Sequence, residues 1–286
     1  MLPDYSKFNY EKLLDGYNAL VTGGASGIGR AIALLYASHG AAVAIADIDA
    51  EKGKATEKEL QAINPGCFFL EANMGDTAQV DTMCDAAISR FGSIQTLVNN
   101  AGVCEEGMLL DSDISSLQRM LDINVVGLVR CTQRILLAMF AGKGGAIVNI
   151  ASDYALRGCP GVSMFAASKG AVFSFTRSIA YEFSRYDIRC NCILPGMNIA
   201  SHGDRYIERY GLEEAMLDFT YYQPIKRRGS EEDVANAALF LGSQLSRFVN
   251  GDAIEVTGGS FARAHKQSSV PDEASAHTWW SEKKSV

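Results

Sequence analysis

Short runs of apolar residues alternate with longer amphipathic stretches from residue 17 to about residue 257. Most of these runs lack a regular alternation of apolar and polar residues, which is typical of strands covered on both faces. We therefore predict strands at 18–22, 42–46, 67–71, 96–100, 145–150, 188–193 and 253–257.

Between the predicted strands, apolar residues recur with the spacing of one helix face. Residues 76–91 show this most clearly, and Asp76 is placed to cap the start of that helix. Its apolar stripe consists of Val80, Met83, Cys84, Ala87, Ile88 and Phe91. Repeated strand–helix units predict a doubly wound (Rossmann) α/β fold: a parallel sheet of about seven strands in a single domain.

Two segments interrupt this rhythm. Residues 197–228 follow a strand end, where ligands bind in such sheets, and are rich in aromatic side chains. They form either a lid over an apolar substrate or an amphipathic helix that packs its own aromatics. Arg205 and Arg209 within them either meet an anionic substrate group or are solvated.

Residues 262–286 are polar and carry Trp279-Trp280 near the end. The paired tryptophans suggest that this tail docks on a neighbouring subunit, and the alternative is a frayed chain end. We therefore expect a catalytic domain over residues 1–261 and a separate tail over 262–286.

Composition narrows the class of protein. With 48% hydrophobic and 21% charged residues the chain can bury a large core, which excludes disorder. A net charge of −7 gives no electrostatic support for a nucleic-acid partner. The polar N-terminus does not resemble a signal peptide, and no uninterrupted apolar run reaches about 18 residues, so we expect no membrane span.

The seven cysteines form no CxxC pair and the four histidines are scattered, which predicts neither a metal site nor a disulfide framework. Cys190 and Cys192 are expected on one face of a strand as small apolar residues. We expect a soluble, reduced, cytoplasmic protein.

The stretch 22-TGGASGIGR-30 carries the first specific chemistry. It follows an apolar strand and opens a helix, so Gly23, Gly27 and Gly29 predict a tight turn that brings backbone amides to a pyrophosphate. The second strand ends at Asp47, whose carboxylate can accept hydrogen bonds from ribose hydroxyls and would repel a 2′-phosphate. The sequence therefore favours NAD over NADP as cofactor; Asp47 otherwise only caps the turn, a task that Asp49 could fulfil.

Over roughly residues 15–260 the chain resembles the short-chain dehydrogenase/reductase family. The resemblance rests on TGGASGIG, 99-NNAG-102, the asparagine of 121-LDINVVG-127, Ser152, Lys169 and 195-PG-196. It implies cofactor contacts from Gly23, Ser26, Gly27, Ile28, Gly29, Asp47, Ile48, Asn73, Met74, Asn100, Ala101, Gly102, Lys169, Pro195, Gly196 and Asn198. Asn73-Met74 stands where the family usually has Asp-Val, and Ala200 stands where it often has a threonine that Asn198 or Ser201 could replace.

The resemblance also implies catalytic roles. Ser152 would hold the substrate oxygen, Lys169 would bind the nicotinamide ribose and tune the acid/base, and Asn124 would relay the proton through water. The family's acid/base is a tyrosine four residues before the lysine and about thirteen after the serine. Both counts lead to Phe165, which has the ring and lacks the hydroxyl.

Three interpretations of Phe165 stay open. It is an engineered change that silences the enzyme, or a natural variant that uses another proton donor, such as Tyr154, Tyr221 or Tyr222. The third is a non-catalytic NAD-binding sensor or subunit.

The implied activity is hydride transfer between NAD(H) and a secondary alcohol or ketone in a homo-oligomer, a dimer or tetramer. Substrate contacts are expected from Ser152, Tyr154, Tyr206 and Tyr222, while steroids, cyclic ketones and polyols all stay open as substrates.

Overall fold

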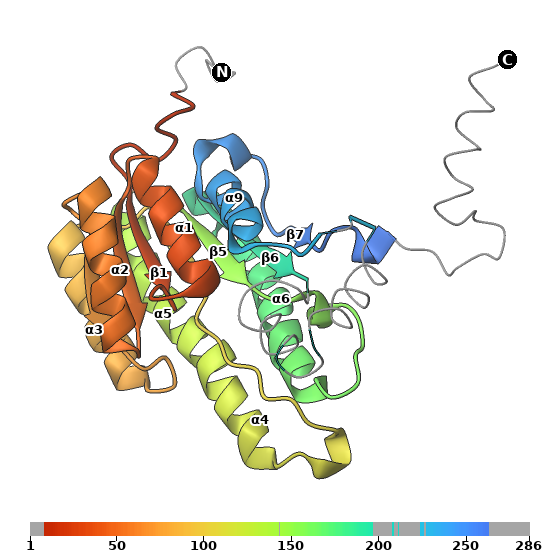
Figure 1. Cartoon of the computed structure of the whole chain (residues 1–286). Coiled ribbons are helices and arrows are strands. Elements are labelled where there is room, and N and C mark those ends of the chain that lie inside the picture. The colour runs from red at the N-terminus through yellow and green to blue at the C-terminus, as the bar shows by residue number, and fades with distance from the viewer. Residues whose placement is uncertain are drawn as a thin grey trace, which may run out of the picture.

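The computed structural model describes residues 9–142, 144–196, 208, 211, 224–225 and 227–262. Seven parallel strands form one sheet in the order β3-β2-β1-β4-β5-β6-β7, and helices cover both faces of it (Figure 1). The strand order reverses between β1 and β4, and this is the position at which ligands bind in doubly wound sheets. The predicted fold is confirmed.

All seven predicted strands are present, with ends that shift by at most two residues. They are β1 (Asn18–Thr22), β2 (Ala42–Asp47), β3 (Phe68–Glu71), β4 (Thr96–Asn99), β5 (Gly145–Ile150), β6 (Ile188–Pro195) and β7 (Ala253–Val256). Cys67 lies outside β3 because its amide donates to Asn64 O in a turn. Pro195 extends β6 because it pairs with Val256 of β7.

Two helical layers enclose the sheet. The longer helices are α1 (Gly27–Ser38), α2 (Ala50–Ile63), α3 (Thr77–Phe91), α4 (Ile114–Leu121), α5 (Leu128–Ala141), α6 (Ser163–Phe183) and α9 (Glu231–Gly242). One core joins α1, α2 and α9 to the sheet, and another joins α3, α5 and α6 to its other face. Short helical turns are η2 (Leu109–Asp111), η3 (Asp122–Gly127), η4 (Asp153–Ala155), η5 (Ser184–Tyr186), η6 (Gln244–Ser246) and η7 (Ser260–Ala262).

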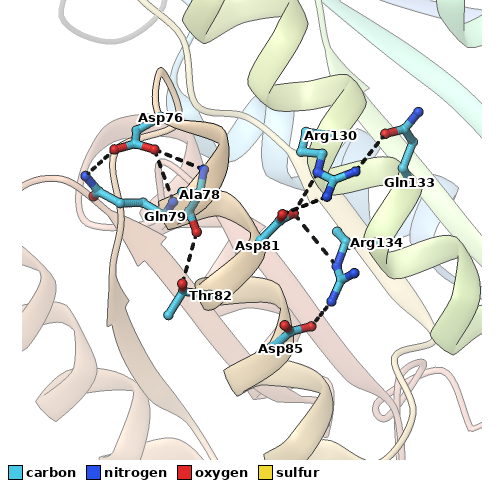
Figure 2. A network of polar contacts seen from close by, with 9 residues as sticks. All are labelled: Asp76, Ala78, Gln79, Asp81, Thr82, Asp85, Arg130, Gln133 and Arg134. Carbon is cyan, nitrogen blue, oxygen red and sulfur yellow. Dashed lines mark hydrogen bonds and ion pairs between the residues drawn. The ribbon is translucent and has the colours of Figure 1, made fainter.

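In helix α3 the predicted cap and the predicted apolar stripe can be compared directly with the structure. Asp76 caps it as predicted, and its Oδ1 accepts from the amides of Ala78 at 2.9 Å and Gln79 at 3.3 Å (Figure 2). The predicted stripe faces the sheet, with Ile88 and Phe91 packed at the margin of the buried cluster. Outside this stripe Arg130 of α5 donates to Asp81, with Nη2 to Oδ2 at 2.6 Å. Both partners are partly exposed, so apolar burial rather than this ion pair holds α3 to α5.

Helices α4 and α5 are joined by η3 into one apolar stretch, Ile114–Ala141. By length and composition it could cross a membrane, with a mean hydropathy of 1.4 over its most apolar window, but half of that window is buried inside the protein. Cys131, Ile135 and Met139 pack into the core with α3. Core packing therefore accounts for the apolar character of this helix.

Candidate active site

The loop between β1 and α1 has a backbone that requires glycine. Gly23 and Gly27 have φ angles of 65° and 53°, which side chains other than glycine rarely adopt. A Cβ atom on Gly29 would lie 2.1 Å from Gly23 O. The loop therefore turns tightly and brings the start of α1 against the end of β1.

The first turn of α1 is suited to bind an anion. Ser26 is the N-cap residue in an extended conformation, and its side chain makes no capping hydrogen bond. The first amides of a helix have no intrahelical acceptor, and here Gly27, Ile28 and Gly29 supply them. This cradle fits a pyrophosphate group.

Asp47 lies at the end of β2, next to this loop. Its Oδ2 accepts from Ala25 N at 3.0 Å and its Oδ1 accepts from Asp49 N at 3.1 Å. Asp49, not Asp47, caps α2 by accepting from Lys52 N. Each Asp47 oxygen keeps a further lone pair that could accept from a ribose hydroxyl. The neighbouring Ile48 is 65% exposed, so its side chain is accessible for packing against an adenine ring.

Asn73 and Met74 follow β3 at the same edge of the sheet. Asn73 Oδ1 accepts from Gly75 N at 2.9 Å, which orders the turn. A Cβ atom on Gly127 would lie 2.0 Å from Met74 O, so this turn packs directly on η3.

The NNAG segment after β4 joins the two parts of the site. Asn100 Nδ2 donates to Thr22 O at 3.0 Å and to Gly23 O at 2.9 Å. A Cβ atom on Gly102 would lie 3.1 Å from Asn124 Oδ1 and 3.2 Å from Lys169 Nζ. Gly102 thus connects the glycine loop with the groups expected to act on substrate.

Lys169 lies in α6, where it is only 5% exposed. Its Nζ donates to Ile150 O at 2.8 Å and lies 5.8 Å from the centroid of the Phe165 ring, one helical turn away. Burial lowers the pKa of Lys169 to about 8. The ammonium is therefore still the main form at neutral pH.

Phe165 occupies the position expected for the acid/base. It is 8% exposed and lies in a small apolar cluster with Met120 and Val162. The Tyr154 ring meets it edge-on, with ring centroids 6.5 Å apart. Burial raises the pKa of Tyr154, as does its hydrogen bond with the Cys159 thiol, so this phenol stays protonated.

Ser152 is the N-cap residue of η4, two positions after the end of β5, and is 7% exposed. Its Oγ donates to Asp153 Oδ1 at 3.2 Å and accepts from Tyr154 N at 3.2 Å. Asp153 is fully buried and ion-paired with Arg157. Burial raises the pKa of Asp153, although Arg157 acts in the opposite direction.

Asp153 and Arg157 were not predicted from the sequence. A carboxylate directly after a buried strand, with an arginine four residues later, could have indicated them. Ser168 was not predicted either; its Oγ donates to Phe165 O at 2.8 Å and accepts from Asn124 Nδ2 at 3.0 Å.

Asn124 lies in η3, a π-helical turn, which is a feature often found at functional sites. Its Oδ1 accepts from Val103 N at 2.8 Å and its Nδ2 also donates to Val103 O at 2.9 Å. With the bond to Ser168, both amide hydrogens are used within the protein. A water molecule that relays a proton at Asn124 would therefore have to donate to the second lone pair of Oδ1.

The far side of the site is described only in part. Pro195 ends β6, and Gly196 N donates to Val256 O at 2.9 Å. The Trp279-Trp280 tail lies outside the described residues, and so do the lining candidates Asn198, Ala200, Ser201, Arg205, Tyr206, Arg209, Tyr221 and Tyr222. Within the described part of the chain, all seven cysteines are free thiols, and no group of three His, Cys, Asp or Glu side chains is arranged to hold a metal.

Comparison with known proteins agrees with this geometry. The family model described as Enoyl-(Acyl carrier protein) reductase matches residues 23–260. A 3-oxoacyl-[acyl-carrier-protein] reductase FabG of Staphylococcus aureus is 34% identical over 245 residues, covering 85% of this chain and 98% of that protein. The (2S)-[(R)-hydroxy(phenyl)methyl]succinyl-CoA dehydrogenase subunit BbsD of Thauera aromatica is 38% identical over 241 residues, covering 84% and 95%.

Solved structures give the same result. Levodione reductase superimposes with a TM-score of 0.83 at 29% identity, over 88% of this chain and 100% of that chain. A 7α-hydroxysteroid dehydrogenase complexed with NADH and 7-oxo glycochenodeoxycholic acid has a TM-score of 0.82 at 31% identity, over 88% and 97%. The chain therefore belongs to the short-chain dehydrogenase/reductase family of oxidoreductases.

Proposed function

We propose that this protein transfers hydride between NAD(H) and a secondary alcohol or ketone, and that Phe165 holds its turnover to a low rate. The observation that carries the proposal is the approach of Asn124 and Lys169 to Gly102. Gly102 lies two residues after Asn100, which donates to Gly23 O of the glycine loop. The bound dinucleotide would supply or accept the hydride. The small-molecule substrate and a cytoplasmic location belong to the same proposal.

The protein residues would manage the substrate oxygen and its proton. Ser152 would hydrogen-bond that oxygen, and the Lys169 ammonium would hold the ribose and stabilise a phenolate at the neighbouring ring position. Because Phe165 has no hydroxyl, the acid/base contribution is missing. Loss of such a group typically lowers the rate by ~10²–10⁴.

The choice of NAD over NADP rests on Asp47. A carboxylate at the end of β2, held by Ala25 N and Asp49 N, would repel a 2′-phosphate and accept from a 2′-hydroxyl. The solved hydroxysteroid dehydrogenase complex, which contains NADH, is in line with this choice.

The substrate we favour is apolar and contains a ring. The support comes from 7-oxo glycochenodeoxycholic acid, the ring compound in the hydroxysteroid dehydrogenase complex, and from the apolar surroundings of Phe165. A test panel should include a hydroxysteroid, a cyclic ketone, a polyol and a 3-oxoacyl thioester, the last because of the reductase relatives.

The test is NAD(H) turnover across this panel by the parent protein and by its Phe165→Tyr variant. We expect a gain of ~10²-fold or more on one substrate. Phe173→Tyr, the same change elsewhere on α6, is the matched control and should give no gain. Absence of turnover in every form would reject the proposed activity.

A second candidate is a non-catalytic NAD-binding regulator or an inactive subunit of an assembly. The apolar cluster around Phe165 is consistent with it, and the Thauera relative is named as a subunit. NADH binding without turnover, before and after Phe165→Tyr, would favour this candidate.

We also propose that the protein is a homo-oligomer, as expected from the sequence. Leu137 of α5 and Tyr181 of α6 are exposed apolar side chains, Tyr181 to 90%, and such side chains are candidates for a subunit contact. A monomeric mass in solution would contradict this proposal.

A further inference from the structure

A buried carboxylate lies behind the hydroxyl expected to contact the substrate. Asp153 has no exposed surface, and its Oδ1 accepts from Ser152 Oγ at 3.2 Å. Its Oδ2 forms an ion pair with Arg157. A carboxylate in this position is held in place from both sides.

The hydrogen bonds of Ser152 determine what its hydroxyl can do. A hydroxyl has one proton and two lone pairs. The proton is directed to Asp153, and one lone pair accepts from Tyr154 N. The remaining lone pair can accept the O–H of an alcohol, so Ser152 links a substrate hydroxyl to the Asp153 carboxylate.

We propose that Asp153, acting through Ser152, accepts the alcohol proton in place of the absent phenol and so supports the residual turnover of this chain. The O–H bond of the alcohol breaks and a new O–H bond forms on Ser152 Oγ. The proton that Ser152 already carried moves to Asp153 Oδ1. The hydride from the carbinol carbon is taken by the oxidised dinucleotide, which balances the electrons, and ketone reduction returns the proton along the same path. This inference rests on the function proposed above.

The surroundings of Asp153 suit a group that is protonated and deprotonated in turn. Burial favours its neutral form, whereas Arg157 favours the carboxylate. Among the described residues, the other titratable side chains on elements next to it are Tyr154, which interacts with both Asp153 and Cys159, and Lys169 on α6, the helix that packs on η4. Tyr154 is a poor competitor as proton acceptor because its raised pKa keeps it protonated.

The test is Asp153→Asn in two backgrounds, the parent protein and the Phe165→Tyr variant. In the parent we expect alcohol oxidation to fall by ~10²-fold. In the Phe165→Tyr background the phenol takes the proton, so the loss should be at least about ten times smaller. Asp81→Asn, which alters an aspartate–arginine pair between α3 and α5, controls for the loss of such a pair and should leave both rates unchanged.

The outcomes separate this inference from the proposed function. An equal loss in both backgrounds indicates a structural role for Asp153 and overturns the inference alone. The same holds if neither background loses activity, or if only Phe165→Tyr turns over at all. Absence of turnover in every form overturns the inference together with the proposed function.

A second measurement needs no cofactor. Carboxyl ¹³C NMR of aspartate-labelled protein, with the Asp153 signal assigned by its loss in Asp153→Asn, gives the pKa of this group directly. Ser152→Ala removes a hydrogen bond that stabilises the carboxylate, so the pKa of Asp153 should rise. An unchanged pKa would show that Ser152 does not donate to Asp153 and would overturn the inference.

Discussion

The proposed cofactor side of the site and the proposed proton-transfer side are built in different ways. Around β1, β2 and β4 the expected binding of the cofactor depends on the main chain. It depends on the backbone conformation of Gly23 and Gly29 and on amides that donate to Asp47. Around β5 and α6 it depends on single side-chain atoms, such as Lys169 Nζ, Ser152 Oγ and the hydroxyl that Phe165 lacks. We therefore expect cofactor binding to survive a change that stops turnover, because the contacts to the cofactor would be shared among several backbone groups.

The largest expected effect tests whether the Lys169 ammonium stabilises a phenolate at position 165. In the Phe165→Tyr background, Lys169→Met should lower kcat/KM by ~10²–10⁴, because the ammonium no longer favours the phenolate. In the parent protein the loss should be much smaller. Steady-state kinetics of all four forms checks this, and equal losses in both backgrounds would show that Lys169 acts only through cofactor binding.

The next effect is on stability and follows from the burial of Lys169. Its folded-state pKa of about 8 lies below the usual 10.5, so the unfolded chain binds more protons between these values and stability rises with pH across that window. Relative to Lys169→Met, the parent should gain up to about 3 kcal/mol from pH 8 to pH 10.5. Urea unfolding of the cofactor-free protein measures this gain, and parallel pH curves for the two proteins would contradict it.

A smaller effect is expected from the glycine loop. Gly29→Ala places a Cβ atom against Gly23 O, and such overpacking should weaken NADH binding by about 1–3 kcal/mol. Gly142→Ala is the matched control, because a Cβ atom there makes only ordinary contacts, the nearest at 3.5 Å. Fluorescence titration with NADH compares the two variants; similar affinities would mean that the loop adjusts without loss.

The smallest effect concerns the choice of cofactor. Asp47→Ser keeps a hydrogen-bonding group and removes the charge that would repel a 2′-phosphate. We expect the NADH over NADPH preference to shift by about tenfold, or ~1.4 kcal/mol, toward NADPH. Affinities for both dinucleotides decide this, and a parent that already prefers NADPH would refute the assignment to Asp47.

The fold could be predicted from the sequence because each β–α unit carries its own local signal. The strand at 42–46 and the helix that starts after Asp76 were recognisable from residues adjacent in sequence, and both are present. Asp49 as the alternative turn cap was likewise open to local reasoning and is observed.

Long-range pairings were harder to predict. The contact of Gly127 with Met74 O joins segments from different units, and no local pattern in 121-LDINVVG-127 indicates a π turn. The bond from Ser152 to Asp153 depends on side-chain orientation after β5, which the apolar pattern does not specify. The lid candidates within 197–228 lie almost entirely outside the described residues and stay predictions.

The π turn η3 inserts one additional residue into an otherwise continuous helix. Each helical residue advances by about 100°, so this residue rotates everything after it relative to everything before it. Asn124 can therefore face Ser168 while Cys131 and Ile135 still face α3. Deleting one residue from this segment would keep a helix but turn its two halves toward the wrong partners. Exchanging side chains at positions other than Asn124 and Gly127 would leave both halves oriented as they are.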